Sequence, residues 1–335
     1  MVDPSLPPSP DAVPLLDVVN LRVGFGSLTV VDGVSFTLHS GEVLGIVGES
    51  GSGKSVSALA LMRLLPPHAT ITADRLTLMG EDLLTATEHR YEALRGASMA
   101  MIFQEPMTAL NPVLTIGRQI TETIRRHSGA GARVARARAL DALKRVGIPA
   151  ADQRIDEYPH QMSGGMRQRV MIAMALACAP KVLIADEPTT ALDVTIQAQI
   201  LELLQDLQDE YRMGTVMITH DLGVVSSFAD RVMIMYAGQV VEQAQASLLF
   251  GAPAHPYTEG LLASIPSTET DVARLYTIPG MVPAPFAFPP GCRFAPRCDH
   301  ARPVCATAKP ALVPTGTGAH RAACIRNTGY AFTAP

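Results

Sequence analysis

Tryptophan is absent from the 335 residues, and aromatic side chains make up only 5% of them. The core must therefore be built from aliphatic side chains and methionine, for which a hydrophobic fraction of 47% is ample. Long apolar runs are also missing, because the longest candidate, residues 170–179, is about half the ~18 residues that a membrane-spanning helix needs. The composition predicts a globular chain, larger than one hydrophobic core usually organises, that does not cross a bilayer.

Positive charge is not in excess, since 27 Lys and Arg stand against 31 Asp and Glu, a net charge of -4. Such a chain has no general attraction to phosphate backbones, so nucleic acid is not an expected partner. The arginines between residues 125 and 138 are expected to form a solvated helix face. The N-terminal "MVDPSLPPSPDAVP" has Asp and Pro where a secretory signal has a basic start and an apolar stretch. We therefore expect a cytosolic protein in which residues 1–14 form a disordered arm.

Cysteine is scarce, and four of the five cysteines lie near the C-terminal end, at Cys292, Cys298, Cys305 and Cys324. Structural disulfides are uncommon in a reducing compartment, whereas metal ligation is not. The clustering therefore favours a metal site over disulfide bonds. Cys178 lies in an apolar helical pattern and is expected to be a buried core residue.

Strand-like and helical patterns alternate over most of the chain. The clearest strand-like segments are "EVLGIVG", "KVLIAD", "GTVMIT" and "RVMIMYAGQVVE". This alternation predicts an α/β fold with a mainly parallel sheet in a domain at 15–264, with an inserted helical lobe at about 105–178. After it, Pro, Gly and Cys replace the periodic pattern. Residues 265–335 are therefore expected to form a loop-rich, Cys-containing extension with a poor core of its own.

Residues 48–55 read Gly-Glu-Ser-Gly-Ser-Gly-Lys-Ser, the pattern of a phosphate loop, after an apolar strand and at the start of a helix. Glycines let backbone N–H groups converge on phosphate oxygens, and the helix N-terminus adds partial positive charge. We expect Lys54 to contact the β and γ phosphates and Ser55 to ligate Mg²⁺. The predicted nucleoside triphosphate site consists of Gly48, Ser50, Gly51, Gly53, Lys54 and Ser55.

A second element, "KVLIADEPTTALD", ends an apolar strand with Asp186 and Glu187. Asp186 matches the strand-end carboxylate that holds Mg²⁺, and Glu187 is placed to orient or deprotonate an attacking water. An ordinary strand terminus with solvated acids is the alternative interpretation, and the phosphate loop favours the catalytic one. The two elements together predict hydrolysis.

A third element, "MSGGMRQRVMIAMALACAP", begins an amphipathic helix with Ser163, Gly164 and Gly165. A hydroxyl, free N–H groups and the helix dipole make this start a second anion site. One nucleotide cannot easily occupy both loops of one compact chain. We therefore expect residues 163–165 to bind the γ-phosphate of ATP that is held by another subunit's phosphate loop.

With these motifs in this order, the sequence strongly resembles the ATP-binding subunits of ABC transporters over about residues 15–264. The resemblance implies adenine stacking by Phe25 and a γ-phosphate contact by His220 that helps to position the water. It also places Asp193 in the nucleotide site, and Gln104 at the magnesium ion with Ser55 and Asp186, where it couples that site to the membrane subunits. The signature departs from the usual Leu-Ser-Gly-Gly-Gln, because methionine stands at both of its ends.

The segment "HPYT" at 255–258 and the Cys-rich extension resemble the oligopeptide and dipeptide importer subgroup, which also contains nickel and some glycan importers. The resemblance implies ATP hydrolysis that powers peptide import, with nickel or another solute as the alternative. A soluble, non-transport ABC ATPase is less supported, because the chain has one ATPase half and no sustained heptads. The implied partners are a second ATPase subunit (another copy or a paralogue), two transmembrane permeases and, indirectly, an extracytoplasmic solute-binding protein. The implied location is peripheral, at the cytoplasmic face of the cell membrane.

Four converging cysteine thiolates suit either a structural zinc ion or an iron–sulfur cluster. Prolines and glycines between the cysteines keep any helix from spreading the thiols apart, and tight Cys-x-x-Cys pairs, common in zinc sites, are missing. The importer subgroup that the sequence resembles carries a [4Fe–4S] cluster on a matching cysteine pattern. The resemblance therefore favours such a cluster in a structural role, with Zn²⁺ and free or disulfide-bonded thiols as alternatives.

Overall fold

The computed structural model describes residues 13–190, 192–265, 276–316 and 319–327, so nearly all of the predicted disordered arm lies outside the described residues. The chain divides into two compact units. Unit 1 combines residues up to 18 with 36–42 and 75–216, and unit 2 combines 19–35, 43–74 and the chain from 217 onward. Among the described residues, no helix is long and apolar enough to span a membrane.

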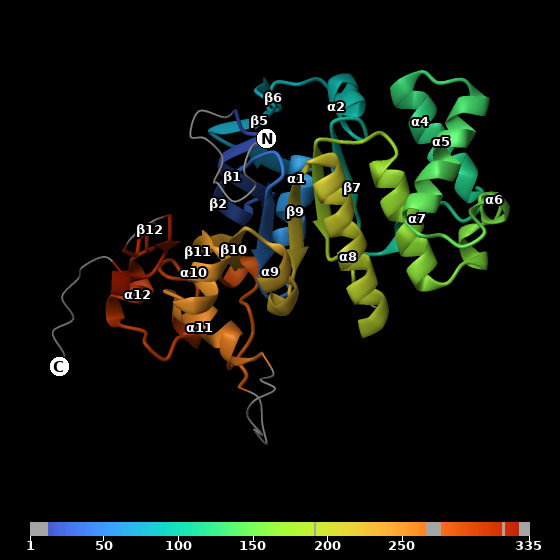
Figure 1. Ribbon diagram of the computed structural model, residues 1–335. Helices are drawn as coiled ribbons and strands as arrows, with labels where there is room; N and C mark the ends of the chain where they lie inside the picture. Colours follow the sequence, from blue (N-terminus) through green and yellow to red (C-terminus); the bar gives the residue numbers. More distant parts are fainter. Residues whose placement is uncertain (1–12, 191, 266–275, 317–318, 328–335) are drawn as a thin grey trace. The chain divides into compact units, whose positions relative to one another are not determined.

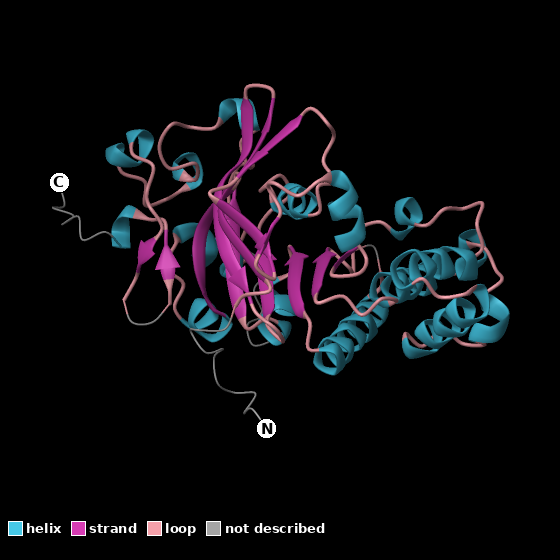
Figure 2. Cartoon of the chain, turned by 90° about the horizontal axis from the view of Figure 1, so that it is seen from above, coloured by secondary structure: helices cyan, strands magenta, loops and turns pink. Residues whose placement is uncertain are grey.

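Strands and helices both occur along the chain (Figure 2), which confirms the predicted α/β class. Three strands run from one unit into the other: β1 (Leu16–Phe25), β2 (Leu28–Leu38) and β9 (Gly214–Thr219). The elements wholly inside unit 1 are β5 (Arg75–Leu78), β6 (Glu81–Asp82), α2 (Glu88–Leu94), β7 (Met99–Ile102), α3 (Pro106–Ala109), α4 (Ile116–Ser128), α5 (Ala132–Arg145), α6 (Ala151–Arg154), η1 (Pro159–Gln161), α7 (Gly164–Leu176), β8 (Val182–Asp186) and α8 (Val194–Tyr211).

Strand β8 carries the acidic element and is buried along its whole length. It pairs in parallel with β7, with Met99 opposite Val182 and Ile102 opposite Ala185. A strand covered on both faces needs apolar side chains at every position, which explains the continuous run before the first acid. The burial of β8 therefore fixes the position of Asp186, its last residue.

Helices α4, α5 and α7 pack against one another and form the helical lobe (green to yellow-green in Figure 1). Helix α4 begins after Thr115, whose side-chain oxygen accepts a hydrogen bond from the Arg118 N–H. Its core face consists of Ile116, Ile120 and Ile124, a spacing of four that places them on one side of a helix, and all three are buried. Sequence periodicity predicts this block because a helix that packs on one side must repeat its apolar residues.

The elements wholly inside unit 2 are β3 (Val43–Val47), α1 (Lys54–Leu61), β4 (Ala69–Thr72), α9 (Leu222–Phe228), β10 (Arg231–Tyr236), β11 (Gln239–Gln245), α10 (Ala246–Gly251), α11 (Pro256–Ala263), η2 (Pro285–Ala287), η3 (Ala295–Arg297), α12 (Pro303–Thr307), β12 (Val313–Pro314), β13 (Arg321–Ala322) and η4 (Ile325–Asn327). Their strands are adjacent in the order β12, β13, β11, β10, β3. Strand β3 is buried throughout and runs parallel to β10, whereas β10 and β11 form an antiparallel hairpin.

The C-terminal extension is loop-rich, as its composition predicts, but it shares the core of unit 2. Phe294 is only 3% exposed and packs in one apolar cluster with residues of β10, β11 and α11, such as Tyr236, Val241 and Tyr257. Strand β13 extends the sheet by pairing with β11, with Ala322 opposite Glu242. The extension is therefore folded against the same unit that contains residues 48–55, while the domain boundary between 264 and 265 stays a prediction.

Candidate active site

Residues 48–55 form the predicted strand, loop and helix, with β3 ending at Val47 and α1 beginning at Lys54. Gly53 takes a φ of 97°, a left-handed conformation that favours glycine. Gly48 lies so close to the next strand that a Cβ there would approach the Met235 carbonyl oxygen to 2.2 Å. Both glycines are thus required by the turn itself, before any ligand is considered.

The Lys54 side chain is buried inside this loop, with 5% of the residue exposed. Its Nζ donates to the Gly48 carbonyl at 2.6 Å and to the Glu49 carbonyl at 3.0 Å. A buried ammonium surrounded by backbone dipoles is a strong site for an anionic oxygen. The loop therefore has both the N–H groups of a helix start and a fixed positive charge to offer a phosphate.

Two further predicted residues, Phe25 and His220, also belong to unit 2. Phe25 is half-buried at the end of β1, with its ring centroid 5.8 Å from that of His68. His220 is exposed directly after β9, and the next residue, Asp221, caps α9 by accepting from the Gly223 N–H at 2.8 Å. Adenine stacking by Phe25 and a γ-phosphate contact by His220 stay predictions.

The acidic pair belongs to unit 1, where Asp186 is the buried last residue of β8 and Glu187 follows it half-buried. Glu187 has a φ of 47°, which is uncommon for a residue other than glycine. Its Oε2 accepts from the Thr190 hydroxyl at 2.8 Å and from the Gln104 side-chain N–H at 3.3 Å. The structure thus brings Gln104 and Glu187 together, although they are far apart in sequence.

Sequence reasoning did not single out Gln168, which connects α7 to the segment after β8. The residue is 2% exposed, and its Nε2 donates to the Pro188 carbonyl at 2.6 Å. Gln197 of α8 similarly donates to the Thr189 carbonyl at 3.0 Å. A polar residue on an otherwise apolar helix face is the signal that could have identified Gln168.

Helix α7 begins at Gly164, and Ser163 is its exposed N-cap, accepting from the Met166 N–H at 3.3 Å. A Cβ on Gly165 would lie 3.0 Å from a methyl carbon of Ile196, so glycine allows α8 to pack closely. Asp193 caps α8 by accepting from the Ile196 N–H at 3.0 Å and is itself exposed. The predicted anion site at 163–165 is therefore an exposed, capped helix start.

All four C-terminal cysteines line one small cavity in unit 2, of about 20 Å³, together with His255. That volume holds roughly one water molecule. Burial raises the pKa of Cys292 to about 11 and also raises the pKa of Cys298 and Cys324. The thiols share a cavity without sharing a coordination sphere, because the described residues contain no group of three or more His, Cys, Asp or Glu that could hold a metal ion. The four cysteines therefore line one cavity, as the sequence predicts. Their side chains are not arranged as the ligands of a metal ion.

The other cysteine, Cys178, is half-buried, so the prediction of a buried core position is wrong for it. Cys178 lies just after the end of α7, in the segment that connects α7 to β8. It lines an open pocket of about 360 Å³ that is also bordered by Arg138 and Tyr211. Apolar periodicity overestimates burial here because it does not indicate where packing against α7 stops.

The phosphate loop, the acidic strand end and the capped helix start define an ATPase. Comparison with known proteins shows which class of ATPase it is. Residues 31–190 match the family described as ABC transporter, and residues 241–305 match the family described as oligopeptide/dipeptide transporter, C-terminal region. The chain belongs to the ABC transporter family, as one of its ATP-binding, ATP-hydrolysing subunits.

Two relatives and one solved structure illustrate the similarity. The oligopeptide transport ATP-binding protein AppD of Bacillus subtilis is 53% identical over 91% of this chain and 94% of its own. The dipeptide transport ATP-binding protein DppD of Escherichia coli is 52% identical over 89% of this chain and 92% of its own. The structure of cbiO1 from Clostridium perfringens, part of the ABC transporter complex cbiONQ, superposes with a TM-score of 0.61 at 27% identity, covering 72% of this chain and 92% of that one.

Proposed function

We propose that this chain hydrolyses ATP to power peptide import through a membrane ABC transporter, as a peripheral subunit at the cytoplasmic face of the membrane. The observation that carries the proposal is similarity along nearly the whole chain to proteins named for dipeptide and oligopeptide transport. It includes the C-terminal extension, which matches the family of that name up to residue 305. The catalytic part of the proposal is supported by Lys54 inside its loop and by the fixed Glu187 carboxylate.

In this proposal Lys54 and the loop N–H groups neutralise the triphosphate, and Ser55, Gln104 and Asp186 hold Mg²⁺. Glu187 orients the attacking water, and the hydrogen bond from Gln104 fixes the carboxylate's direction. His220 contacts the γ-phosphate. The adenine stacks on Phe25, and Asp193 completes the nucleotide site.

The same proposal needs a second ATPase subunit, either another copy of this chain or a paralogue. Ser163, Gly164 and Gly165 lie at an exposed helix start, where they can reach a nucleotide that another subunit holds. Two transmembrane permeases provide the path for the solute, and an extracytoplasmic solute-binding protein delivers it. Nucleic acid has no part in this assembly.

Two measurements test the proposal. Calorimetric titration of the purified full chain with Mg²⁺ and ATP should give strong binding, which Lys54→Ala should weaken because the only ammonium inside the loop is lost. Vesicles that contain the assembled transporter should then take up a labelled dipeptide or oligopeptide only when ATP is supplied. Uptake of nickel without peptide uptake would replace the proposed substrate, and unchanged ATP affinity of the variant would remove residues 48–55 as the site.

We also propose that Cys292, Cys298, Cys305 and Cys324 together hold a structural [4Fe–4S] cluster. The donor set fits the group in kind, since four cysteine thiols line one cavity. The cavity is small, so the lining side chains must move outward when a cluster is inserted, and a single zinc ion needs less movement. Such a group would cross-link short loops and turns that have few apolar contacts of their own.

Anaerobic purification tests the cysteine proposal directly. The protein should be brown and contain iron and acid-labile sulfide in equal amounts, and Cys298→Ser should lose both. Cys178→Ser is the matched control, because Cys178 lies in unit 1 and should leave the iron content unchanged. Colourless protein with one bound zinc ion per chain would replace the cluster by Zn²⁺ and retain the four ligands.

A further inference from the structure

One ion pair joins the cysteine segment of the extension to the phosphate loop. The Arg297 guanidinium donates to both carboxylate oxygens of Glu49, at 3.1 and 2.9 Å. Arg297 lies between Cys292 and Cys298, whereas Glu49 is the second residue of the loop. The arginine side chain is 6% exposed and the glutamate side chain 30% exposed, so the pair is shielded from water more than a surface salt bridge is.

The position of Arg297 is fixed independently of Glu49. Its Nε donates to the Pro279 carbonyl at 2.8 Å, and a terminal nitrogen donates to the Ile278 carbonyl at 3.3 Å. The guanidinium carbon also lies 5.7 Å from the centroid of the Tyr236 ring, within range of a cation–π contact. A guanidinium held on several sides can impose a direction on the carboxylate that it binds.

Glu49 is held through its backbone as well as its side chain. Its N–H donates to the Tyr257 hydroxyl at 2.9 Å, and its carbonyl accepts from Lys54 at 3.0 Å. Tyr257 is fully buried and belongs to the "HPYT" segment at 255–258. The residue next to the first glycine of the loop is therefore fixed at three points, two of which come from the C-terminal part of the chain.

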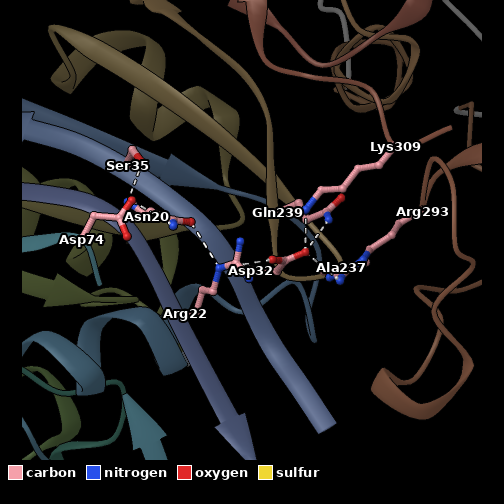
Figure 3. A network of polar contacts seen from close by, with 9 residues as sticks. All are labelled: Asn20, Arg22, Asp32, Ser35, Asp74, Ala237, Gln239, Arg293 and Lys309. Carbon is pink, nitrogen blue, oxygen red and sulfur yellow. Dashed lines mark hydrogen bonds and ion pairs between the residues drawn. The ribbon is translucent and has the colours of Figure 1, made fainter. Parts of the chain in front are cut away.

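A second arginine of the same segment, Arg293, lies beside Asp32 and the turn at Ala237, as Figure 3 shows. Arg293 donates to the Ala237 carbonyl and to the Asp32 carboxylate, the latter at 3.2 Å. The adjacent Gly238 N–H donates to the carbonyl of Ser52, inside the phosphate loop, at 2.8 Å. Arg297 thus contacts the loop directly at Glu49. Arg293 acts only through the turn, whose Gly238 N–H bonds to Ser52.

An acidic residue in a loop that binds a triphosphate is electrostatically unfavourable unless its charge is compensated. An unpaired Glu49 carboxylate would repel the β and γ phosphates and would also compete for Lys54. Pairing with Arg297 neutralises the carboxylate and turns it towards the extension. The negative charge of the loop is therefore compensated by a residue outside the loop.

We propose that Arg297 is a positioning residue of the ATP site, which sets the phosphate loop through Glu49 and so lets the C-terminal extension control ATP affinity. The proposal rests on the function proposed above for residues 48–55. It assigns no chemical step to Arg297. Its effect should appear in the binding of ATP and in KM, and much less in kcat of the assembled transporter.

The test is a set of variants of the full chain, titrated calorimetrically with ATP and Mg²⁺ at low ionic strength. Arg297→Gln should weaken ATP binding about tenfold, which corresponds to ~1.4 kcal/mol. Arg297→Lys should recover part of the affinity, because it keeps the charge and loses the hydrogen bonds to the Pro279 and Ile278 carbonyls that fix the guanidinium. The double variant Arg297→Gln with Glu49→Gln should return to within about twofold of the unmodified chain, since no unpaired carboxylate remains.

Two controls separate the possible failures. Arg326→Gln removes the same charge from the same extension, where Arg326 pairs with Glu259 at the surface, and it should leave ATP affinity unchanged. Lys54→Ala reports on the loop itself. If Lys54→Ala abolishes binding while Arg297→Gln has no effect, only the positioning role is overturned; if neither changes binding, the proposed ATP site is overturned with it. A double variant as weak as Arg297→Gln alone would also overturn the role, because it would indicate damage to the fold.

Discussion

At the scale of single residues, Glu187 is the most constrained of the predicted catalytic groups. A φ of 47° in a residue other than glycine costs about 1–3 kcal/mol and persists only where the surroundings impose it. Here the buried end of β8 precedes the residue, and Thr190 and Gln104 hold its carboxylate. Such a conformation fits a side chain whose direction matters more than its contribution to stability.

Glu187→Gln should leave ATP binding within about twofold and reduce hydrolysis by the assembled transporter at least ~100-fold, because the amide cannot take a proton from water. The measurement is phosphate release at saturating ATP. Glu202→Gln on helix α8 is a matched control, since Glu202 is exposed, and it should retain full turnover. Hydrolysis at the unmodified rate in Glu187→Gln would remove the residue from the catalytic role.

His255 makes a pH-dependent contribution to stability, because burial and, to a smaller extent, the positive charge of Arg326 lower its pKa to about 3. An unfolded histidine has a pKa of roughly 6.5, so between these two values the unfolded state binds more protons than the folded state. The stability that neutral His255 permits is therefore complete above about pH 6.5 and is lost as the pH falls towards 3. The slope is roughly 1.4 kcal/mol per pH unit.

His255→Asn should flatten this dependence, since asparagine keeps an acceptor for the Tyr257 N–H and does not titrate. The charged neighbours stay in place, with the Glu242 carboxylate accepting the backbone N–H of residue 255 and lying 2.7 Å from His320 Nε2. Urea unfolding gives the free energy of unfolding at pH 7 and at pH 5. The decrease in this free energy from pH 7 to pH 5 should be about 2 kcal/mol smaller in the variant. Equal differences in both proteins would contradict a buried neutral imidazole.

Local sequence could predict the loop residues and the acidic pair, because each motif lies within a few positions of a strand end or a helix start. It could not predict that Arg297 pairs with Glu49, because the two residues are 248 positions apart in the sequence. A glutamate in a phosphate loop indicates that its charge needs compensation, but nothing in the local sequence indicates which basic residue provides it. Only the fold of unit 2 brings them within hydrogen-bond distance.

At the scale of secondary structure, the sequence predicted best where a cap and an apolar period agree. Helix α8 (Val194–Tyr211) has both signals, with Asp193 as its N-cap and Ile200, Leu204 and Leu207 on its buried side. The extension was harder, because its helices and strands are a few residues long and have no period to detect. Its contribution to the core comes from single apolar side chains such as Phe294, which no pattern distinguishes from a loop residue.

The hairpin turn between β10 and β11 requires glycine at position 238. Gly238 has a φ of 81°, and a Cβ there would lie 2.0 Å from the Val30 carbonyl oxygen. Gly238→Ala should therefore lower the free energy of unfolding by about 3 kcal/mol and also weaken ATP binding, because the Gly238 N–H holds Ser52. Gly26→Ala is the control, with a φ of 58° and nothing within 4 Å, and should cost only about 1 kcal/mol. Urea denaturation of both variants checks the difference, and equal costs would contradict the close approach.

At the scale of the whole molecule, the predicted nucleotide residues are distributed over two compact units. The phosphate loop, Phe25 and His220 belong to unit 2, whereas Asp186, Glu187 and the 163–165 helix start belong to unit 1. Sequence order could not predict this division, because each unit is assembled from segments that are interrupted by the other. Only the class of fold followed from the order of strands and helices.

Association of two ATPase subunits should depend on ATP and on Ser163. Glu187→Gln with Mg²⁺ and ATP should double in mass by light scattering, either alone or with its paralogous subunit. Adding Ser163→Asp should abolish association, because aspartate repels the γ-phosphate but remains a good N-cap for α7. Circular dichroism should confirm that the helix content is unchanged. Undiminished association of the Ser163→Asp protein would contradict a role for residues 163–165 at the opposite nucleotide.

Arg293 and Arg297 lie between Cys292 and Cys298 in one short segment, and this placement makes two binding equilibria reciprocal. Any ligand of the thiols that stabilises the placement of the arginines also stabilises the ATP-competent loop, since Arg297 contacts Glu49 directly. By thermodynamic linkage, the factor by which such a ligand tightens ATP binding equals the factor by which ATP tightens the ligand. A cell that alters its supply of that ligand would thereby change the ATP concentration at which half of these subunits bind ATP.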